Sequence, residues 1–325
     1  MNIPMEPIRL AAQLTTQMLP KAFIDFATLA AIGAPILAVI LEITAKARKK
    51  IFYDKLAGQI ATLSLILYLL FMLCLSGAAV YFSRKIPWVQ DWFINPSSPL
   101  MMLYITLGVT LLSLIPYKYS WKKLKKNKAL HISIGTAGAL GGVATIHVAT
   151  IIMKSFFSLQ TESIAPAVPQ VPFYSYFYEI PGTAGLCLAA LYLIMAISFA
   201  ATAGGLYLAL RRNKDNFGRD YYKFSLPVIS KWALIPTLAQ LAAVVAIFYY
   251  LCGPNIEILY GDLTTAICLG VSLGLTILCC AIWIVTCKSE TPMRHKIGLG
   301  LAPFFIIAAH ATLMAGAMKL YLTLP

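Results

Sequence analysis

The chain has 325 residues, of which 60% are hydrophobic and only 12% are charged. This composition leaves too much apolar surface for one soluble core and predicts a polytopic membrane protein. The net charge of +14 at pH 7 would suit nucleic acid, but the basic residues gather in short loops between apolar segments, as the positive-inside rule expects. We therefore expect no nucleic-acid partner, and we predict the cytoplasmic (inner) membrane of a prokaryote as the location.

Residues 1–20 mix polar and apolar side chains without a basic start and an apolar block, so we expect no cleavable signal peptide. The seven cysteines lie in or at the ends of apolar segments and lack metal-site spacing. No Cys-x-x-Cys-His motif occurs, which excludes covalently bound haem c. We expect the cysteines to serve as small packing residues.

Eight apolar segments are each long enough to cross a bilayer of about 30 Å at about 1.5 Å per residue. The loops after the first, third, fifth and seventh segments are rich in lysine and arginine, and the opposite loops are poor in them. The sequence therefore predicts an all-α membrane protein with eight transmembrane helices and both termini on the periplasmic side. The segments are 22–43, 57–82, 99–117, 129–156, 182–210, 228–252, 262–287 and 297–322.

The second half of the chain echoes the first half. Leu107–Thr110 (LGVT) matches Leu269–Ser272 (LGVS), and His147 in IHVAT matches His310 in AHAT. Four helices followed by four more in the same orientation predict two tandem units related by a pseudo-twofold axis along the membrane normal. We expect an N-terminal periplasmic segment (1–20), a first four-helix unit (21–160), a periplasmic loop rich in proline and aromatic residues (161–181) and a second four-helix unit (182–325).

The loop 161–181 supports two interpretations. Its aromatic residues are typical of a belt at the membrane interface. They also suit a docking face for a periplasmic partner, or the rim of a lipid-quinone pocket.

All four histidines lie on the fourth and eighth segments or at their edges: His131, His147, His295 and His310. Histidine inside a membrane is costly and usually functional, and imidazoles from facing helices commonly hold b-type haem. We predict one haem b between His147 and His310, with His131 and His295 as a weaker second pair. The alternative is histidines that are hydrogen-bonded to backbone or hydroxyl groups of other helices.

Helical geometry favours one haem over two. At about 100° per residue, His295 and His310 lie about 60° apart around the helix axis, whereas His131 and His147 lie about 160° apart. His131 instead shares a face with several glycines, which allow either a second helix or a flat cofactor to approach closely. These glycines are Gly135, Gly138 and Gly142.

Four other residues are candidates with competing interpretations. Met153 and Met314 are alternative axial ligands, although core packing is the commoner role of methionine. Asp25 and Glu42, near the two ends of the first segment, are candidates for proton or quinone chemistry, or they simply reach the interface.

Three stretches resemble a known family. Phe26–Glu42 (FATLAAIGAPILAVILE), Tyr53–Lys55 (YDK) and Trp121–Gly135, with its HxxxG, are similar to the first four helices of subunit I of cytochrome bd quinol oxidases. The resemblance extends over about residues 20–225. It implies a bundle of four-helix units, haem b, and quinol as the electron donor.

The chain departs from that family at its functional positions. A haem-ligand histidine is expected nine residues before Gly33, where this chain has Ile24, and the fifth segment has no histidine near Cys187. The third segment lacks the acids of the oxygen-reducing site, and the loop 253–261 is too short to be the quinol-binding loop. We therefore expect no oxygen reduction by bd-type chemistry.

The sequence thus favours a b-haem membrane subunit of a respiratory complex. It would move electrons between lipid quinone and a periplasmic redox partner, such as a cytochrome or an iron–sulfur subunit. The second hypothesis is a haem-free, bd-like scaffold that anchors other subunits, because the family's ligands are missing. The third is a transporter, which the repeat suggests but the small number of intramembrane charges disfavours.

Overall fold

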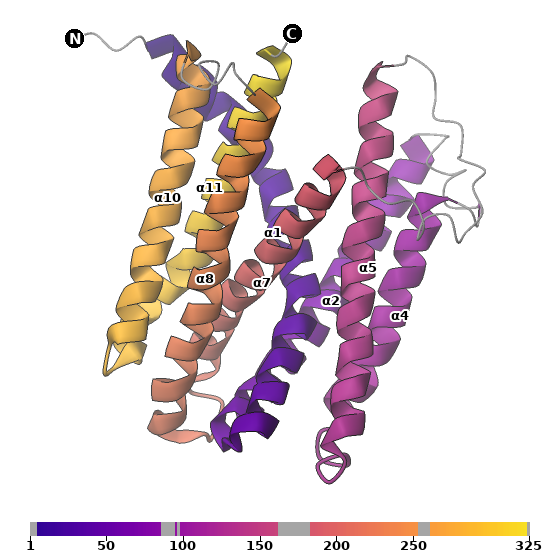
Figure 1. The fold of residues 1–325 in the computed structure, drawn as a ribbon, viewed down its shortest axis with the longest axis vertical. Coiled ribbons are helices and arrows are strands. Elements are labelled where there is room, and N and C mark those ends of the chain that lie inside the picture. The colour runs from indigo at the N-terminus through magenta and orange to yellow at the C-terminus, as the bar shows by residue number, and fades with distance from the viewer. Residues whose placement is uncertain (1–4, 86–94, 96–97, 162–182, 253–260, 324–325) are drawn as a thin grey trace. The chain divides into compact units, whose positions relative to one another are not determined.

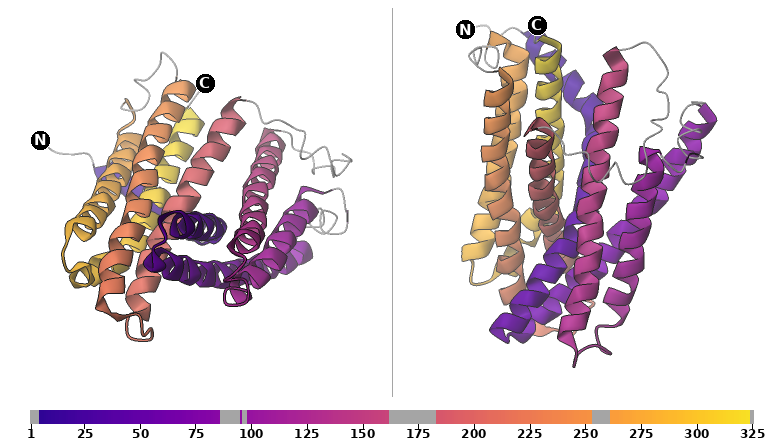
Figure 2. Two further views of the ribbon diagram at one scale, coloured as in Figure 1. Left: turned by 60° about the horizontal axis from the view of Figure 1, so that its bottom comes forward. Right: turned by 45° about the vertical axis from the view of Figure 1, so that its right-hand side comes forward.

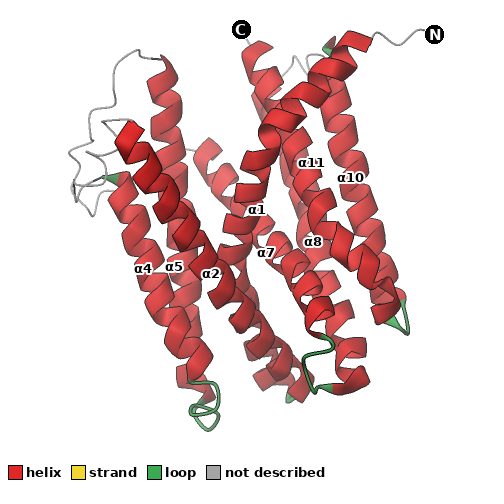
Figure 3. Ribbon diagram, turned by 180° about the vertical axis from the view of Figure 1, so that it is seen from behind, coloured by secondary structure: helices red, strands yellow, loops and turns green. Residues whose placement is uncertain are grey.

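The computed structural model describes residues 5–85, 95, 98–161, 183–252 and 261–323 (Figure 1). Within these ranges the regular structure is helical throughout, and no strand is present (Figure 3). Eight of the described helices are long and apolar enough to cross a membrane. The predicted all-α fold with eight spanning helices is therefore confirmed. Apart from Thr161, the predicted periplasmic loop 161–181 lies outside the described residues.

Each predicted segment lies within a helix or differs from it by one residue at the start. A short 3₁₀ helix, η2 (Pro292–His295), precedes the last helix. The long helices are α1 (Met5–Arg48), α2 (Ile51–Lys85), α4 (Pro99–Tyr119), α5 (Lys128–Thr161), α7 (Thr183–Arg211), α8 (Gly218–Cys252), α10 (Leu263–Lys288) and α11 (Lys296–Thr323).

The helix α1 begins well before the predicted start at residue 22. Residues 5–21 contain no glycine. Of their two prolines, Pro7 lies in the first turn, where a proline is tolerated, and Pro20 lies inside the helix. One face of this part is apolar: Ala11 packs against Cys268 of α10 and Ala315 of α11. The burial of that face explains why the helix continues through a stretch that the hydropathy pattern assigned to a separate segment.

The described chain forms two compact units. Unit 1 comprises Met1–Leu29 and Ile197–Pro325, and unit 2 comprises Ala30–Ala196. The helices α1 and α7 therefore each contribute one part to either unit. The tandem division into 21–160 and 182–325, its pseudo-twofold axis and the periplasmic position of the termini stay predictions.

Unit 2 is held by close packing of α5 on α4, which lie side by side in two further views (Figure 2), while α4 also packs on α2. The glycine face of α5 forms this seam. A Cβ added at Gly135 would lie 2.5 Å from Cε2 of Tyr117 and 2.8 Å from Cγ2 of Val39. At Gly142 it would lie 3.3 Å from Ile32. Side chains of α4 and α1 thus fill the space that the sequence left open to either a helix or a flat cofactor.

In unit 1, α10 packs against both α8 and α11. Hydroxyl groups join neighbouring helices: Ser272 Oγ donates to the carbonyl oxygen of Ala309 at 2.7 Å. Ser198 Oγ and Thr237 Oγ1 lie 2.5 Å apart and link α7 to α8. Small residues and interhelical hydrogen bonds are the usual means of association in lipid, where the hydrophobic effect does not drive helices together.

The close packing of α5 on α4 predicts that one added methyl group lowers the stability of the protein at some glycines and not at others. Gly135→Ala should lower the free energy of unfolding by about 1–3 kcal/mol, because the methyl group would overlap Tyr117 and Val39. The matched control is Gly108→Ala in α4, where an added Cβ meets nothing within 4 Å. There alanine should be neutral or stabilise by up to about 1 kcal/mol. Denaturant titration of the purified protein measures both, and equal midpoints for the two variants would contradict this account of the seam.

The start of α10 predicts a pH effect. Asp262 Oδ2 accepts from the backbone N–H of Thr265 at 2.9 Å and from its hydroxyl at 2.7 Å. Burial opposes ionisation of Asp262, but the hydrogen bonds from Thr265 outweigh it, and the pKa of Asp262 falls below its ordinary value. The cap should therefore stabilise fully above the ordinary aspartate pKa and weaken as the pH falls through the lowered pKa.

Two variants at Asp262 separate the stabilisation by the capping hydrogen bond from the stabilisation that depends on the charge of the carboxylate. Asp262→Ala should cost about 1 kcal/mol at neutral pH because the cap is lost. Asp262→Asn keeps a capping oxygen that does not titrate, so thermal unfolding of this variant should lose the acid-dependent part of the wild-type profile. An unchanged pH profile in Asp262→Asn would rule out this contribution.

Candidate functional site

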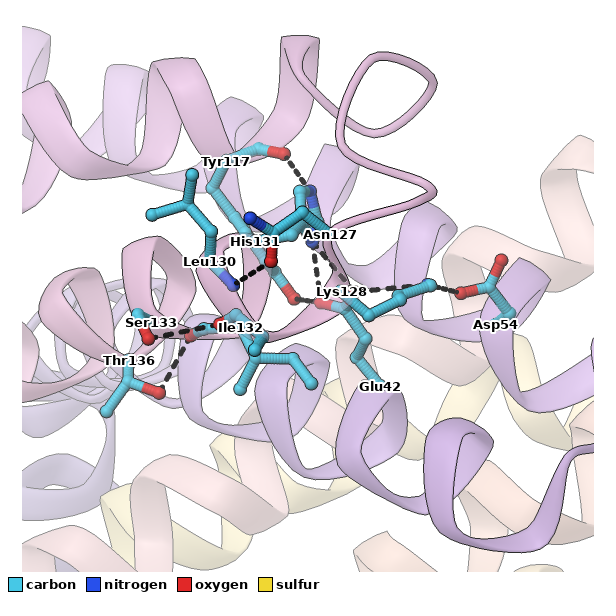
Figure 4. Close-up of polar contacts among 11 residues, drawn as sticks. Glu42, Asp54, Tyr117, Asn127, Lys128, Leu130, His131, Ile132, Ser133 and Thr136 are labelled. Carbon is cyan, nitrogen blue, oxygen red and sulfur yellow. Dashed lines mark hydrogen bonds and ion pairs between the residues drawn. The ribbon is translucent and has the colours of Figure 1, made fainter.

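The candidate site is built around a carboxylate that is sealed inside unit 2. Glu42 lies near the end of α1, and its side chain has no exposed surface. An isolated charge in such a position is strongly unfavourable, so it must be paired or neutralised. The sequence identified Glu42 only as a candidate at the helix end. The structure shows that its carboxylate contacts side chains from both α4 and α5 (Figure 4).

His131 is the principal partner of Glu42. Its Nδ1 lies 2.7 Å from Oε1 and 2.9 Å from Oε2 of the carboxylate, and its Nε2 lies 2.8 Å from the carbonyl oxygen of Tyr117. The local sequence places the ring there: Asn127 caps the start of α5 by accepting from the N–H of Leu130, and His131 follows in the first turn. Both ring nitrogens are therefore engaged.

These contacts fix how many protons the pair holds. The carbonyl oxygen of Tyr117 only accepts, so Nε2 of His131 must carry a proton. An ionised Glu42 also only accepts, in which case Nδ1 carries a second proton and the ring is an imidazolium. If Glu42 holds that proton instead, its O–H donates to a neutral ring. Either way, the pair retains one proton more than a carboxylate beside a neutral imidazole.

Two further groups complete the network. Tyr117 donates its phenolic O–H to Oε2 of Glu42 at 2.9 Å. Lys128 Nζ lies 3.2 Å from Oε1 of Glu42 and also forms an ion pair with Asp54 of α2. The shared proton and Lys128 together balance the two carboxylates, so the whole cluster is neutral. We name the set Glu42, Asp54, Tyr117, Lys128 and His131 the Glu42 network.

The Glu42 network reaches from the interior of unit 2 toward its surface. Glu42 is fully enclosed, whereas the side chains of Lys128 and Asp54 are 25% and 31% exposed. The aromatic rings of Tyr117 and Trp121 each lie 4.6 Å from the His131 ring, centroid to centroid. The arrangement can hold a proton at a buried position and connect it to the surface by charged side chains. It also joins α1, α2, α4 and α5.

A second acid–histidine pair occurs in unit 1. His310 Nε2 lies 3.2 Å from Oδ2 of Asp25, and Lys21 Nζ lies 2.7 Å from the same oxygen. The ring of Phe199 packs edge-on against His310 at 5.9 Å. Both acids that the sequence selected on α1 thus pair with a histidine: Asp25 with His310, and Glu42 with His131.

The remaining candidates lie apart from these two pairs. His147 is half-buried on α5 in unit 2, and His295 is half-buried in η2 in unit 1. Met314 packs against the apolar side chains of Ala22 and Ile307 in unit 1. The side chain of Met153 lies outside the described residues.

The described residues give a poor fit to a haem at His131. A haem iron needs a free nitrogen lone pair, and both nitrogens of His131 are already hydrogen-bonded. The rings of Tyr117 and Trp121 also pack directly on the imidazole. At His310, Nε2 is held by Asp25, while Nδ1 is buried without a hydrogen-bond partner. The pairing of His147 with His310 stays a prediction.

Sequence reasoning did not propose four residues of this site, which are the network members Asp54, Tyr117 and Lys128, and Trp121, which packs on the His131 ring. Each lies at the end of a predicted segment or in the short loop beside it, where charged and aromatic residues are common and indicate nothing specific. The one usable signal was Lys128, which lies one helical turn before His131. The contacts to Glu42 span 75 to 89 residues of sequence, a separation that no local pattern reveals.

Comparison with known proteins identifies the fold. No protein-family model matches the sequence, and no curated protein matches it. The structure is similar to a chain of the bd oxidase from Geobacillus thermodenitrificans, with a TM-score of 0.66 and 16% sequence identity. The match covers 95% of this chain and 87% of that chain. This chain is therefore a multi-pass membrane protein with a bd-oxidase-like fold, as the resemblance of its first helices predicted.

The Glu42 network predicts strong coupling between two residues. Glu42→Leu should destabilise the protein by about 3–5 kcal/mol, because Lys128, His131 and Tyr117 would lose their buried polar partner. Glu42→Leu combined with His131→Leu should cost clearly less than the sum of the single changes. Denaturant titration of the four proteins in this cycle measures the coupling.

The control is Glu6→Leu, which removes an exposed acid in the first turn of α1. It should change stability by no more than about 0.5 kcal/mol. Additive effects of Glu42→Leu and His131→Leu would show that the two residues do not act as a pair.

Proposed function

We propose that this chain is a haem-free, bd-like subunit of a prokaryotic respiratory membrane complex, which anchors partner subunits rather than carrying electrons itself. Its likeness to a bd oxidase chain over most of both lengths supports a place in such a complex. Its loss of the ligand histidines that the resemblance leads one to expect supports a structural role. Partner subunits would be redox proteins of the same membrane, such as a periplasmic cytochrome or an iron–sulfur protein.

The observation that carries the proposal is the engagement of the histidines by carboxylates. His131 has both ring nitrogens hydrogen-bonded, and His310 has Nε2 on Asp25. Haem ligation needs an imidazole nitrogen that is free to bind iron. In this arrangement His131 and His310 instead use ring nitrogens for hydrogen bonds to acids. The Glu42 network would then act as a rigid brace that fixes four helices of unit 2 relative to one another.

One observation favours a second candidate, a b-haem subunit that passes electrons between lipid quinone and the periplasmic partner. The Nδ1 atom of His310 is buried and has no hydrogen-bond partner, so one nitrogen of the predicted His147/His310 pair has a free lone pair. A haem there would supply one-electron chemistry, and the protein would supply ligation and burial.

A pigment spectrum of the purified chain and its complex separates the two candidates. The first proposal expects no reduced-minus-oxidised band of b-type haem in the isolated chain, while partner subunits co-purify with it at fixed stoichiometry. The second expects such a band at one haem per chain and its loss in His147→Ala or His310→Ala.

The matched control is His295→Ala, which removes a histidine that belongs to neither acid–histidine pair. It should leave both the spectrum and the co-purification unchanged. A stoichiometric b-type band that His310→Ala removes and His295→Ala keeps would overturn the haem-free proposal. Isolation of a colourless chain without any partner would contradict its anchoring role.

A further inference from the structure

Unit 1 contains a pocket of about 510 Å³ that the haem-free function does not use. Residues of α8, α10 and α11 line it, together with Phe199 of α7. Aliphatic and aromatic side chains make up most of its walls, and the few polar residues among them include Gln240, Ser272, Thr276 and His310. The volume and the apolar lining suit a small lipophilic molecule.

Two polar atoms of the lining residues have no partner. His310 and Gln240 are each 9% exposed, and both His310 Nδ1 and Gln240 Oε1 are buried without a hydrogen bond. The hydroxyls of the same lining are satisfied, because Ser272 donates to the Ala309 carbonyl at 2.7 Å and Thr276 donates to the Ser272 carbonyl at 2.8 Å. Buried polar atoms are nearly always paired, so these two exceptions indicate a missing partner.

The chemistry of that partner follows from the tautomer of His310. Asp25 accepts from Nε2 of His310, so this nitrogen carries the ring proton. Lys21 lies 2.7 Å from the same carboxylate and supplies it with a positive charge, so Asp25 does not require a second cation. With its single proton on Nε2, the His310 ring presents a lone pair at Nδ1. Gln240 Oε1 is an acceptor as well. Two residues that line the pocket therefore carry buried acceptors that a hydrogen-bond donor would satisfy.

This requirement narrows the class of ligand. An oxidised quinone carries acceptors alone and satisfies neither atom. A single water can donate, but it leaves most of an apolar pocket of this size unfilled. A molecule with a hydroxyl group on an apolar body satisfies both conditions. Val245 and Tyr249 border the pocket on α8 and are 68% and 66% exposed, which gives such a molecule a lateral entry from the lipid.

We propose that this pocket is a binding site for a lipophilic alcohol or phenol. Its hydroxyl group donates to His310 Nδ1 or Gln240 Oε1, and its apolar body lies against the aliphatic wall of α8 and α10. The proposal goes with the haem-free function, because it uses the same Nδ1 lone pair of His310 that haem ligation would need.

The test compares two probes that differ only in the donor. Tritiated para-dodecylphenol and its methyl ether are titrated against the full-length protein in lipid nanodiscs, and saturable binding is measured. The phenol should bind about tenfold more tightly than the ether, as expected for the one hydrogen bond that its hydroxyl group donates. In Gln240→Leu this preference should fall to about threefold or less, because one acceptor is removed.

Two further variants make the result specific to the pocket. Ala246→Trp places a bulky side chain at an exposed position of the lining and should abolish saturable binding of both probes. Gln59→Leu makes the same chemical change as Gln240→Leu at a buried glutamine of unit 2, outside the pocket, and should leave the phenol preference intact.

Several results would overturn the proposal. Equal affinity for phenol and ether would show that the pocket is only an apolar surface, suited to packing by a helix of a partner subunit. Saturable phenol binding that persists in Ala246→Trp would place the site elsewhere. A preference that Gln59→Leu and Gln240→Leu reduce alike would mean that neither acceptor in the pocket is responsible.

Discussion

The buried carboxylate of Glu42 is the constraint on which unit 2 depends. A charge without any exposed surface has to be balanced within hydrogen-bond distance, and no single neighbouring helix supplies enough partners. Its partners come from α4 and α5 and are Tyr117, Lys128 and His131, and Lys128 is in turn paired with Asp54 of α2. The helices must therefore meet in one register for the cluster to be neutral. This requirement adds specificity to the packing of glycines and small residues, which by itself tolerates sliding.

The two acid–histidine pairs give the repeat a different meaning from the one that the sequence suggested. The matching of His147 with His310 pointed to two equivalent histidines that share a cofactor. In the structure, α1 supplies one acid to each unit: Asp25 pairs with His310 in unit 1, and Glu42 pairs with His131 in unit 2. A histidine that is hydrogen-bonded to a carboxylate has a polar partner inside the bundle, so its presence in a membrane helix does not by itself indicate a metal.

The fold and the chemistry of this chain have diverged to different degrees. At 16% identity the backbone still matches a bd oxidase chain over 95% of its length, because helix length, loop charge and close packing at small residues are enough to maintain a bundle in lipid. The packing of the bundle does not by itself require a histidine at any one ligand position. Ile24 stands where the resemblance leads one to expect a histidine. Asp25, the next residue, supplies the acid that pairs with His310 in unit 1.

The sequence by itself determined the eight membrane helices and their class, since hydropathy and helix length are properties of contiguous residues. It also selected Asp25, Glu42, His131 and His310 as unusual in a membrane. Only the tertiary structure decided which acid pairs with which histidine, because Glu42 and His131 lie 89 residues apart. In addition, a histidine that ligates a metal cannot be told by sequence from one that is hydrogen-bonded to an acid. The early start of α1 and the two unpaired acceptors of the pocket likewise depend on packing between distant helices, which a linear pattern does not encode.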